Sequence, residues 1–109
     1  MVDKDRQETF SEFLDKEKQN KLFVRLVFTP KGAIEEFAVI YCAIIDNVPY
    51  EVVRYDCSAR ETIHVHHFFK KKRKRKRHLE RERNYDTIEE FMETIKKNWH
   101  DYRMKFLEK

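Results

Sequence analysis

The sequence predicts an α+β fold: a four-stranded antiparallel meander with a long C-terminal helix and an N-terminal helix packed on the sheet. Three observations predict it: alternating apolar residues in successive segments after residue 20, short polar turns between them, and a helical apolar repeat near the C-terminus. With 109 residues, 40% of them apolar, residues 1–109 are expected to form a single domain with one hydrophobic core.

An N-terminal helix is expected from Asp3 to Asn20. Its evidence is a weak helical spacing of apolar residues, because Phe10, Phe13 and Leu14 fall on one face and charged residues occupy the others. Such a helix would cover part of the sheet.

Four strands are expected next. They are Lys21–Thr29, Ala33–Ile45, Val48–Cys57 and Thr62–Phe69. The segment Thr29-Pro30-Lys31-Gly32 has the composition of a tight turn in which Gly32 adopts a positive φ, and Asp46-Asn47 is a plausible two-residue turn. Short loops between successive strands favour an antiparallel meander.

A long helix ends the predicted fold. Its apolar residues recur every three or four positions: Ile88, Phe91, Met92, Ile95, Trp99, Tyr102 and Phe106. The segment from Thr87 to Glu90 has the form of a capping box, in which each side chain satisfies a free backbone amide of the other residue. The repeat predicts an aromatic stripe packed on one face of the sheet.

The hairpin pairings predict which side chains share a face of the sheet. If Thr29 pairs with Ala33, and Ile45 with Val48, one face carries Phe23, Val27, Phe37, Val39, Tyr41, Val52, Arg54 and Asp56. The other face then carries Leu22, Val24, Leu26, Ile40, Val53 and Tyr55. Both faces are apolar near their centre, so a second copy of the chain covering one of them makes a homodimer the expected assembly.

Several protein classes are excluded by composition. No stretch approaches the ~20 consecutive apolar residues of a membrane span, and the charged segment Met1 to Asn20 does not resemble a signal peptide. The same pairing places Cys42 opposite Glu51 and far from Cys57, so we expect two reduced thiols. The expected protein is cytoplasmic and has no membrane partner. Few Gly, Pro and amide residues beside abundant Lys, Arg and Glu are typical of thermophile proteins.

A basic segment spans residues 70–83. It holds ten Lys or Arg and two Glu, so its net charge is +8 and the rest of the chain sums to −4, since the total is +4. The predicted nucleic-acid-binding residues are Lys70, Lys71, Lys72, Arg73, Lys74, Arg75, Lys76, Arg77, Arg81 and Arg83. Such a cluster binds phosphates without sequence preference, and we expect RNA slightly ahead of DNA. The alternatives are a solvated segment that maintains solubility, an anionic membrane surface or a targeting signal.

A second candidate site is the strand that carries His64 and His66. If the preceding loop has five residues, Asp56 meets Thr62 and Arg54 meets His64, so both histidines join Arg54 and Asp56 on one face. A four-residue loop would instead set the histidines beside Val53 and Tyr55.

The first arrangement has the parts for metal-independent RNA cleavage. One imidazole would deprotonate the 2′-hydroxyl, the other would protonate the leaving 5′-oxygen, Arg54 would stabilise the phosphorane, and Asp56 would orient one histidine. The alternatives are two histidines on a half-exposed strand without chemistry, or a metal site completed by Asp56. No Gly-rich phosphate loop, CxxC pair or nucleophile elbow is present, so neither a cofactor nor a metal is expected.

The chain resembles a small prokaryotic, mainly archaeal, family of unknown function. The resemblance lies in Phe28-Thr29-Pro30-Lys31-Gly32, Ile34-Glu35-Glu36-Phe37, the segment from Tyr50 to Asp56, the histidine-bearing strand and the segment from Asn98 to Arg103. Arg54-Tyr55-Asp56 followed by a His-x-His strand is also similar, over a short stretch, to TumE-type toxins of toxin–antitoxin pairs. That similarity implies an RNA-directed growth inhibitor with an antitoxin-like protein partner, and a role for Arg54, Asp56, His64 and His66.

Three hypotheses follow. The first is a small nucleic-acid-binding protein that uses the basic segment, the second is a metal-independent ribonuclease that uses the paired histidines, and the third is a protein-interaction module whose open sheet face binds a partner.

Overall fold

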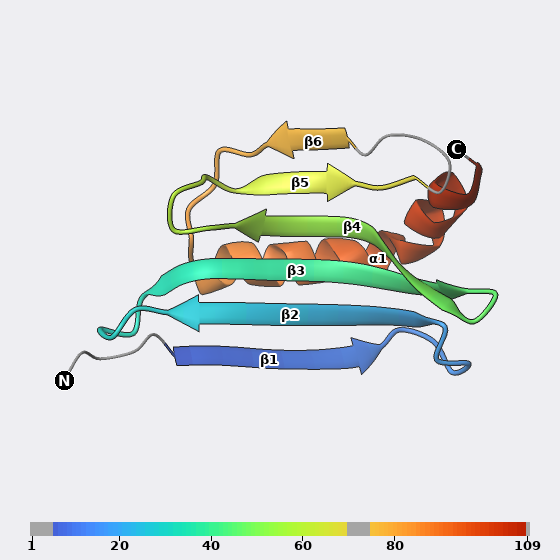
Figure 1. Ribbon diagram of the computed structural model, residues 1–109, viewed down its shortest axis with the longest axis horizontal. Helices are drawn as coiled ribbons and strands as arrows, with labels where there is room; N and C mark the ends of the chain where they lie inside the picture. Colours follow the sequence, from blue (N-terminus) through green and yellow to red (C-terminus); the bar gives the residue numbers. More distant parts are fainter. Residues whose placement is uncertain (1–5, 70–74, 109) are drawn as a thin grey trace.

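A computed structural model describes residues 6–69 and 75–108, which form one antiparallel sheet and one helix (Figure 1). The six strands, in both sequence and spatial order, are β1 (Arg6–Phe13), β2 (Asn20–Phe28), β3 (Ile34–Ile45), β4 (Val48–Cys57), β5 (His64–His67) and β6 (Arg75–His78). The helix, α1 (Tyr85–Glu108), crosses one face of the sheet and packs against β2, β3 and β4. The predicted α+β class, antiparallel meander and C-terminal helix are therefore confirmed.

The predicted N-terminal helix is wrong. Residues 6–13 form β1, which pairs with β2 along its whole length, and Asp15 closes the connecting turn by accepting hydrogen bonds from the backbone amides of Gln19 and Asn20 at 3.0 and 2.9 Å. Phe10 and Phe13 remain 46% and 49% exposed. The helical spacing of these two rings gave a wrong prediction because neither ring is buried. Their spacing therefore does not mark a face that packs against the core.

The predicted number of four strands is also wrong, because β1 and β6 extend the sheet at both edges. Strand β6 lies inside the basic segment and pairs with β5 from His64–His78 to His67–Arg75. All four of its residues are exposed, and none is apolar, so no alternation of hydrophobicity marks it as a strand.

Both predicted turns are present. Gly32 adopts φ +88° and its amide donates to the carbonyl of Thr29 at 2.9 Å, while the amide of Thr29 donates to the carbonyl of Ala33 at 2.8 Å. Asp46 and Asn47 have φ angles of 52° and 66°, as a two-residue turn of type I′ requires.

Two β-bulges change the predicted faces. In the first, Val27 pairs with Glu36 and Phe28 with Ile34, so one residue of β3 is left without a partner. In the second, Tyr41 pairs with Val53 and Cys42 with Glu51, so one residue of β4 is left without a partner. Each bulge moves the register by one residue, so the side chains of β3 lie on the opposite face from the predicted one, relative to those of β2 and β4. Strands β2 and β4 keep their predicted relation because the two shifts cancel. The side chains facing α1 therefore include Leu22, Val24, Leu26, Phe37, Val39, Tyr41, Val53 and Tyr55, whereas Ile40 lies on the opposite face.

The core lies between the sheet and α1. The helix buries Ile88, Phe91, Ile95 and Phe106, and the ring of Phe91 stacks on Tyr55 with centroids 4.2 Å apart. Each such large side chain contributes about 1.5–3 kcal/mol through burial. The predicted capping box is wrong.

At the start of α1, the side-chain oxygen of Asn84 accepts a hydrogen bond of 2.9 Å from the amide of Thr87. Thr87 itself lies inside the helix and is buried, and Glu90 pairs with Arg81 instead of capping the helix. Asn84 is the residue before the first helical turn, where an amide side chain is a preferred cap.

The sheet face opposite α1 is open. Its central apolar residues, Ala38 and Ile40, are nevertheless only 4% and 8% exposed. Arg25 lies opposite Ala38, and Arg54 lies opposite Ile40, so the aliphatic stems of the two arginines can cover them. Cys42 lies opposite Glu51, as predicted, and both cysteines are free thiols. Within the described ranges, no helix is both long and apolar enough to span a bilayer.

Candidate functional site

Strands β4, β5 and β6 bring polar side chains together in two rows on the open face. The first row is Asp56, His64 and His78, and the second is Arg54, His66 and Lys76. The structure therefore gathers all four residues that the sequence singled out for acid–base chemistry. The register differs from the prediction, because Asp56 meets His64 rather than Thr62 and the connecting loop is correspondingly longer.

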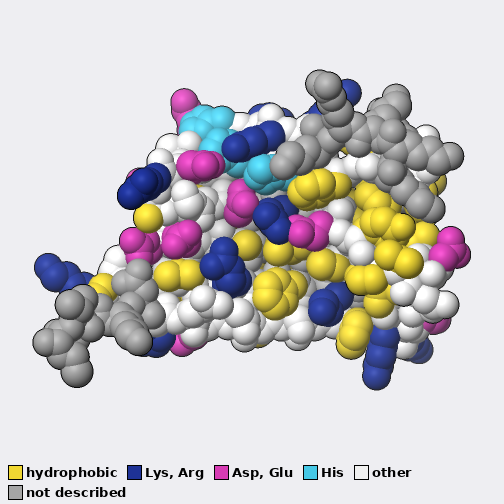
Figure 2. Space-filling model, in the orientation of Figure 1, with side chains coloured by type: hydrophobic (Ala, Val, Ile, Leu, Met, Phe, Trp, Pro, Cys, Tyr) yellow, Lys and Arg dark blue, Asp and Glu magenta, His cyan; other side chains and the backbone are white. Residues whose placement is uncertain are grey.

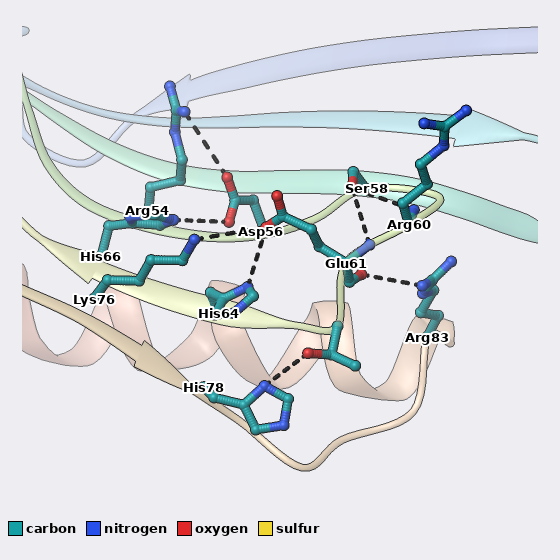
Figure 3. Close-up of polar contacts among 11 residues, drawn as sticks. Arg54, Asp56, Ser58, Arg60, Glu61, His64, His66, Lys76, His78 and Arg83 are labelled. Atoms are coloured by element: carbon teal, nitrogen blue, oxygen red, sulfur yellow. Dashed lines mark hydrogen bonds and ion pairs between the residues drawn. The ribbon is translucent and has the colours of Figure 1, made fainter.

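Asp56 is the central acceptor of this polar cluster (Figure 3). One of its carboxylate oxygens lies 3.1 Å from Nε2 of His66, and the other lies 3.8 Å from Nη1 of Arg54. The guanidinium of Arg54 also donates to Glu51 at 2.7 Å. Two carboxylates thus hold Arg54, which leaves its charge largely compensated.

The imidazole of His66 is enclosed. Its Nε2 is occupied by Asp56, and its Nδ1 is buried without a hydrogen-bond partner among the described residues. The side chain is 11% exposed. A general acid or base must present a nitrogen to its substrate. In this geometry His66 is suited to fix the position of Asp56 rather than to exchange protons with a ligand.

His64 is nearly as enclosed, since its side chain is 15% exposed and its Nδ1 is also buried without a hydrogen-bond partner, but no described residue pairs with its Nε2. Its Nδ1 lies 3.7 Å from a carboxylate oxygen of Glu61, and its ring centroid lies 6.3 Å from that of His66. The same Glu61 oxygen lies 3.6 Å from Nζ of Lys76. Glu61 comes from the loop between β4 and β5, so this loop neutralises part of the positive charge at the cluster.

His78 is a member of the cluster that sequence reasoning missed. Its ring lies edge-on to His64 with centroids 5.5 Å apart, and its Nδ1 lies 2.7 Å from the hydroxyl of Thr62. His78 is exposed. The pairing of β5 with β6 creates this neighbour, and the absence of apolar residues in β6 left no signal for that pairing.

The basic segment divides into three parts. Lys70, Lys71, Lys72, Arg73 and Lys74 lie outside the described residues. Arg75, Lys76 and Arg77 belong to β6 and are exposed. Arg81 and Arg83, the last two predicted cations, form hydrogen bonds within the protein.

Arg81 forms a two-pronged ion pair with Glu90 of α1. Arg83 donates to the backbone carbonyls of Glu35 and Glu61 at 2.9 and 3.1 Å, which ties the segment before α1 to the start of β3 and to the loop between β4 and β5. These two arginines are therefore structural in their contacts, whereas β6 presents its cations to solvent.

Strand alternation splits the cations of β6 between the two faces of the sheet. Lys76 lies opposite His66 on the open face. Arg75, opposite His67, and Arg77, opposite Val65, lie on the face that carries α1. Strand β6 also forms the outer edge of the described sheet. A ligand that follows this edge would meet cations on both sides.

The open face is chemically divided (Figure 2). Histidines gather over β5 together with acidic and basic side chains, and apolar side chains gather toward the other end of the sheet. A shallow depression of about 260 Å³ beside the cluster is lined by Arg25, Asp56, Glu61, His66 and Lys76 among others. The described residues hold no group of three or more His, Cys, Asp or Glu arranged to bind a metal ion.

Comparison with known proteins identifies a family. No curated protein and no solved structure is similar to this chain. Residues 3–109 match the model of a family described as a domain of unknown function, DUF7718, which agrees with the predicted membership of a family without an assigned activity. Because this match covers almost the whole sequence, the protein belongs to the DUF7718 family.

Proposed function

We propose that this protein binds nucleic acid, RNA in preference to DNA, through phosphate contacts along β6. The observation that carries the proposal is the run of three exposed cations, Arg75, Lys76 and Arg77, on an edge strand. Neither arginine forms an ion pair with a described residue. Arginine offers two parallel donors to a phosphate, and neutralising phosphates releases condensed counterions.

A preference for single strands rests on the surroundings of this edge. Single strands expose bases that can contact aromatic side chains, and β6 is flanked by His67 and Tyr102 on the side of α1. A duplex keeps its bases stacked and would use the phosphate contacts alone.

A cationic edge strand also prevents pairing with the edge of another sheet, so charge on β6 has a purely structural explanation as well. The two explanations differ in an observable way. Protection against aggregation needs charge but no ligand, whereas phosphate binding requires affinity for nucleic acid that falls as salt rises.

The test compares two triple variants of the full chain by gel retardation with single-stranded RNA and with DNA. The β6 variant carries Arg75→Gln, Lys76→Gln and Arg77→Gln. The control variant carries Lys16→Gln, Lys31→Gln and Lys97→Gln, which removes the same charge from exposed positions on other elements. We expect the β6 variant to lose RNA retardation and the control to keep most of it. Equal losses in both variants, or no retardation by the wild type, would contradict the proposal.

A second candidate function is metal-independent RNA cleavage, which the approach of His78 to His64 favours. In this proposal one of these imidazoles takes the proton of the 2′-hydroxyl as its oxygen attacks phosphorus. The other donates a proton to the 5′-oxygen as the bond to phosphorus breaks, which gives a 2′,3′-cyclic phosphate and a 5′-hydroxyl. Lys76 takes the place predicted for Arg54 beside the phosphorane, because Arg54 is held between Glu51 and Asp56.

End-labelled RNA incubated with the protein in EDTA tests this candidate. Cleavage should disappear in His64→Ala and in His78→Ala, and the products should end in a 2′,3′-cyclic phosphate. His66→Ala should reduce cleavage only as far as it disturbs Asp56. Intact RNA with the wild-type protein would exclude the ribonuclease and leave the binding proposal unchanged.

The remaining expectations also stay predictions. They are a homodimer, a cytoplasmic location, an archaeal origin and a toxin-like role with an antitoxin-like partner. Light scattering tests the first directly, since a dimer doubles the mass of 13.5 kDa.

A further inference from the structure

A pocket of about 260 Å³ lies on the side of the sheet that carries α1, next to the basic edge strand. Its floor is a row across three strands, Val53 of β4, His67 of β5 and Arg75 of β6. The last turns of α1 form the opposite wall with Tyr102, Lys105 and Phe106. The pocket is thus continuous with the edge to which the proposed function assigns phosphate binding.

The interior of this pocket is apolar and aromatic. Val52, Val53 and Phe106 are each at most 2% exposed, so they form a rigid base to the pocket. The rings of His67 and Tyr102 lie with centroids 6.0 Å apart at an angle of 57°. A flat aromatic body can contact such a wall over one of its faces.

The rim of the pocket is positively charged. Arg75 and Lys105 both line it, and none of the described lining residues is acidic. Burial lowers the pKa of His67, and the nearby charges of Arg77, Lys105 and Arg75 lower it further, so several cations act on this position together. Lys105 also forms an exposed ion pair with Asp101, whose carboxylate lies 3.1 Å from its Nζ.

An apolar aromatic interior with two cations at the rim fits a flat ring joined to an anion. We infer that this pocket receives one unstacked nucleobase of a single-stranded RNA, while Arg75 and Lys105 bind the adjoining phosphate. The inference rests on the proposed RNA-binding function and narrows its ligand to single strands. A base in a duplex would first have to leave its stack, which costs a few kcal/mol.

Fluorescence anisotropy with three probes tests this inference: a single-stranded RNA, the same strand with an abasic site at its centre, and an RNA duplex. Loss of one stacked base weakens binding roughly five- to 150-fold. We expect the wild type to bind the intact strand more tightly than the abasic strand by a factor in this range. Tyr102→Leu should abolish the difference, because it removes the ring but keeps an apolar side chain.

Lys105→Gln provides a second variant that does not disturb the core, since Lys105 is exposed. Lys97→Gln is its matched control, an exposed lysine on the same helix that does not line the pocket. Lys105→Gln should weaken binding of the intact strand, and Lys97→Gln should leave it nearly unchanged.

The possible failures are distinguishable. Salt-sensitive binding with equal affinity for intact and abasic strands overturns the pocket inference and leaves the proposed function standing. A duplex bound as tightly as the single strand overturns it as well. Absence of salt-sensitive binding to all three probes removes the proposed function itself, and the inference with it.

Discussion

The salt dependence of RNA binding can be worked out from the contacts of each cation. Within the described part of the basic segment, Arg81 and Arg83 are engaged by Glu90 and by backbone carbonyls. We therefore count the three exposed cations of β6, Arg75, Lys76 and Arg77, as available to phosphates, with Lys76 exchanging its exposed ion pair with Glu61 for a phosphate contact. Each contact with a single strand contributes about 0.7 to the slope of log affinity against log salt. Neutralising the three side chains of β6 should therefore make the slope less negative by about 2.

This change is large enough to measure by anisotropy. Over a fourfold rise in salt, the wild type should lose roughly 16-fold more affinity than the β6 variant. Arg81→Gln should leave the slope unchanged, because its charge is already paired with Glu90. The reasoning is refuted if the β6 variant and the wild type have equal slopes, or if Arg81→Gln changes the slope as much as a substitution in β6.

Three further predictions concern stability and pH, each measured by urea unfolding. Arg83→Gln should lower the free energy of unfolding by about 1–3 kcal/mol, because a charged donor to two carbonyls is lost; no change would show that the two bonds are dispensable. Tyr41→Phe should cost about 1 kcal/mol, since the buried hydroxyl donates to Asn20 and burial raises the pKa of Tyr41 to about 12, which keeps it protonated. Because the pKa of His67 is lowered in the folded protein, the unfolded chain takes up a proton at a higher pH than the folded protein does. The free energy of unfolding therefore falls as the pH drops from above to below the ordinary histidine pKa of about 6.5. His67→Gln should reduce the loss of stability between about pH 7.5 and about pH 5.5, and an identical loss in both proteins would contradict this.

The predictable part of the fold is the part in which burial imposes a pattern. Strands β2, β3 and β4 each bury side chains against α1, and their sequences show it, by alternation in β2 and by a long apolar run in β3. The turns at Gly32 and at Asp46-Asn47 could be located because positive φ angles demand particular residues. The helix could be located from an apolar repeat that is buried in the structure.

Both edge strands escaped prediction for one reason. Each residue of β1 and of β6 is exposed, so neither strand carries a period of two. They are held in the sheet by backbone pairing with β2 and β5. Backbone hydrogen bonds do not require particular side chains, so they impose no pattern on the sequence. In β1 the chance spacing of Phe10 and Phe13 then favoured a helix.

The candidate site was predicted in part, because β4 and β5 could be paired from their turns and alternation. The correct face for Arg54, Asp56, His64 and His66 follows from one of the two loop lengths considered, although the actual register is shifted by two residues. A shift of two preserves the face of every side chain. The position of His78 beside His64 depends on the pairing of β6 with β5 and could not be predicted.

Alternation along β6 allows single substitutions to separate the two proposed activities. Arg75 lines the pocket beside α1, whereas Lys76 lies opposite His66 on the open face. If the pocket takes a base, the bound base holds the adjoining phosphate against Arg75, so Arg75→Gln should weaken binding of the intact RNA strand more than binding of the abasic strand. Lys76→Gln should weaken binding of both strands equally. If the histidines cleave RNA, Lys76→Gln should slow cleavage at saturating protein. Arg75→Gln should alter only the protein concentration at which cleavage reaches half its maximal rate. Identical effects of the two variants in both assays would mean that β6 acts only through its total charge, and neither face would then hold a specific site.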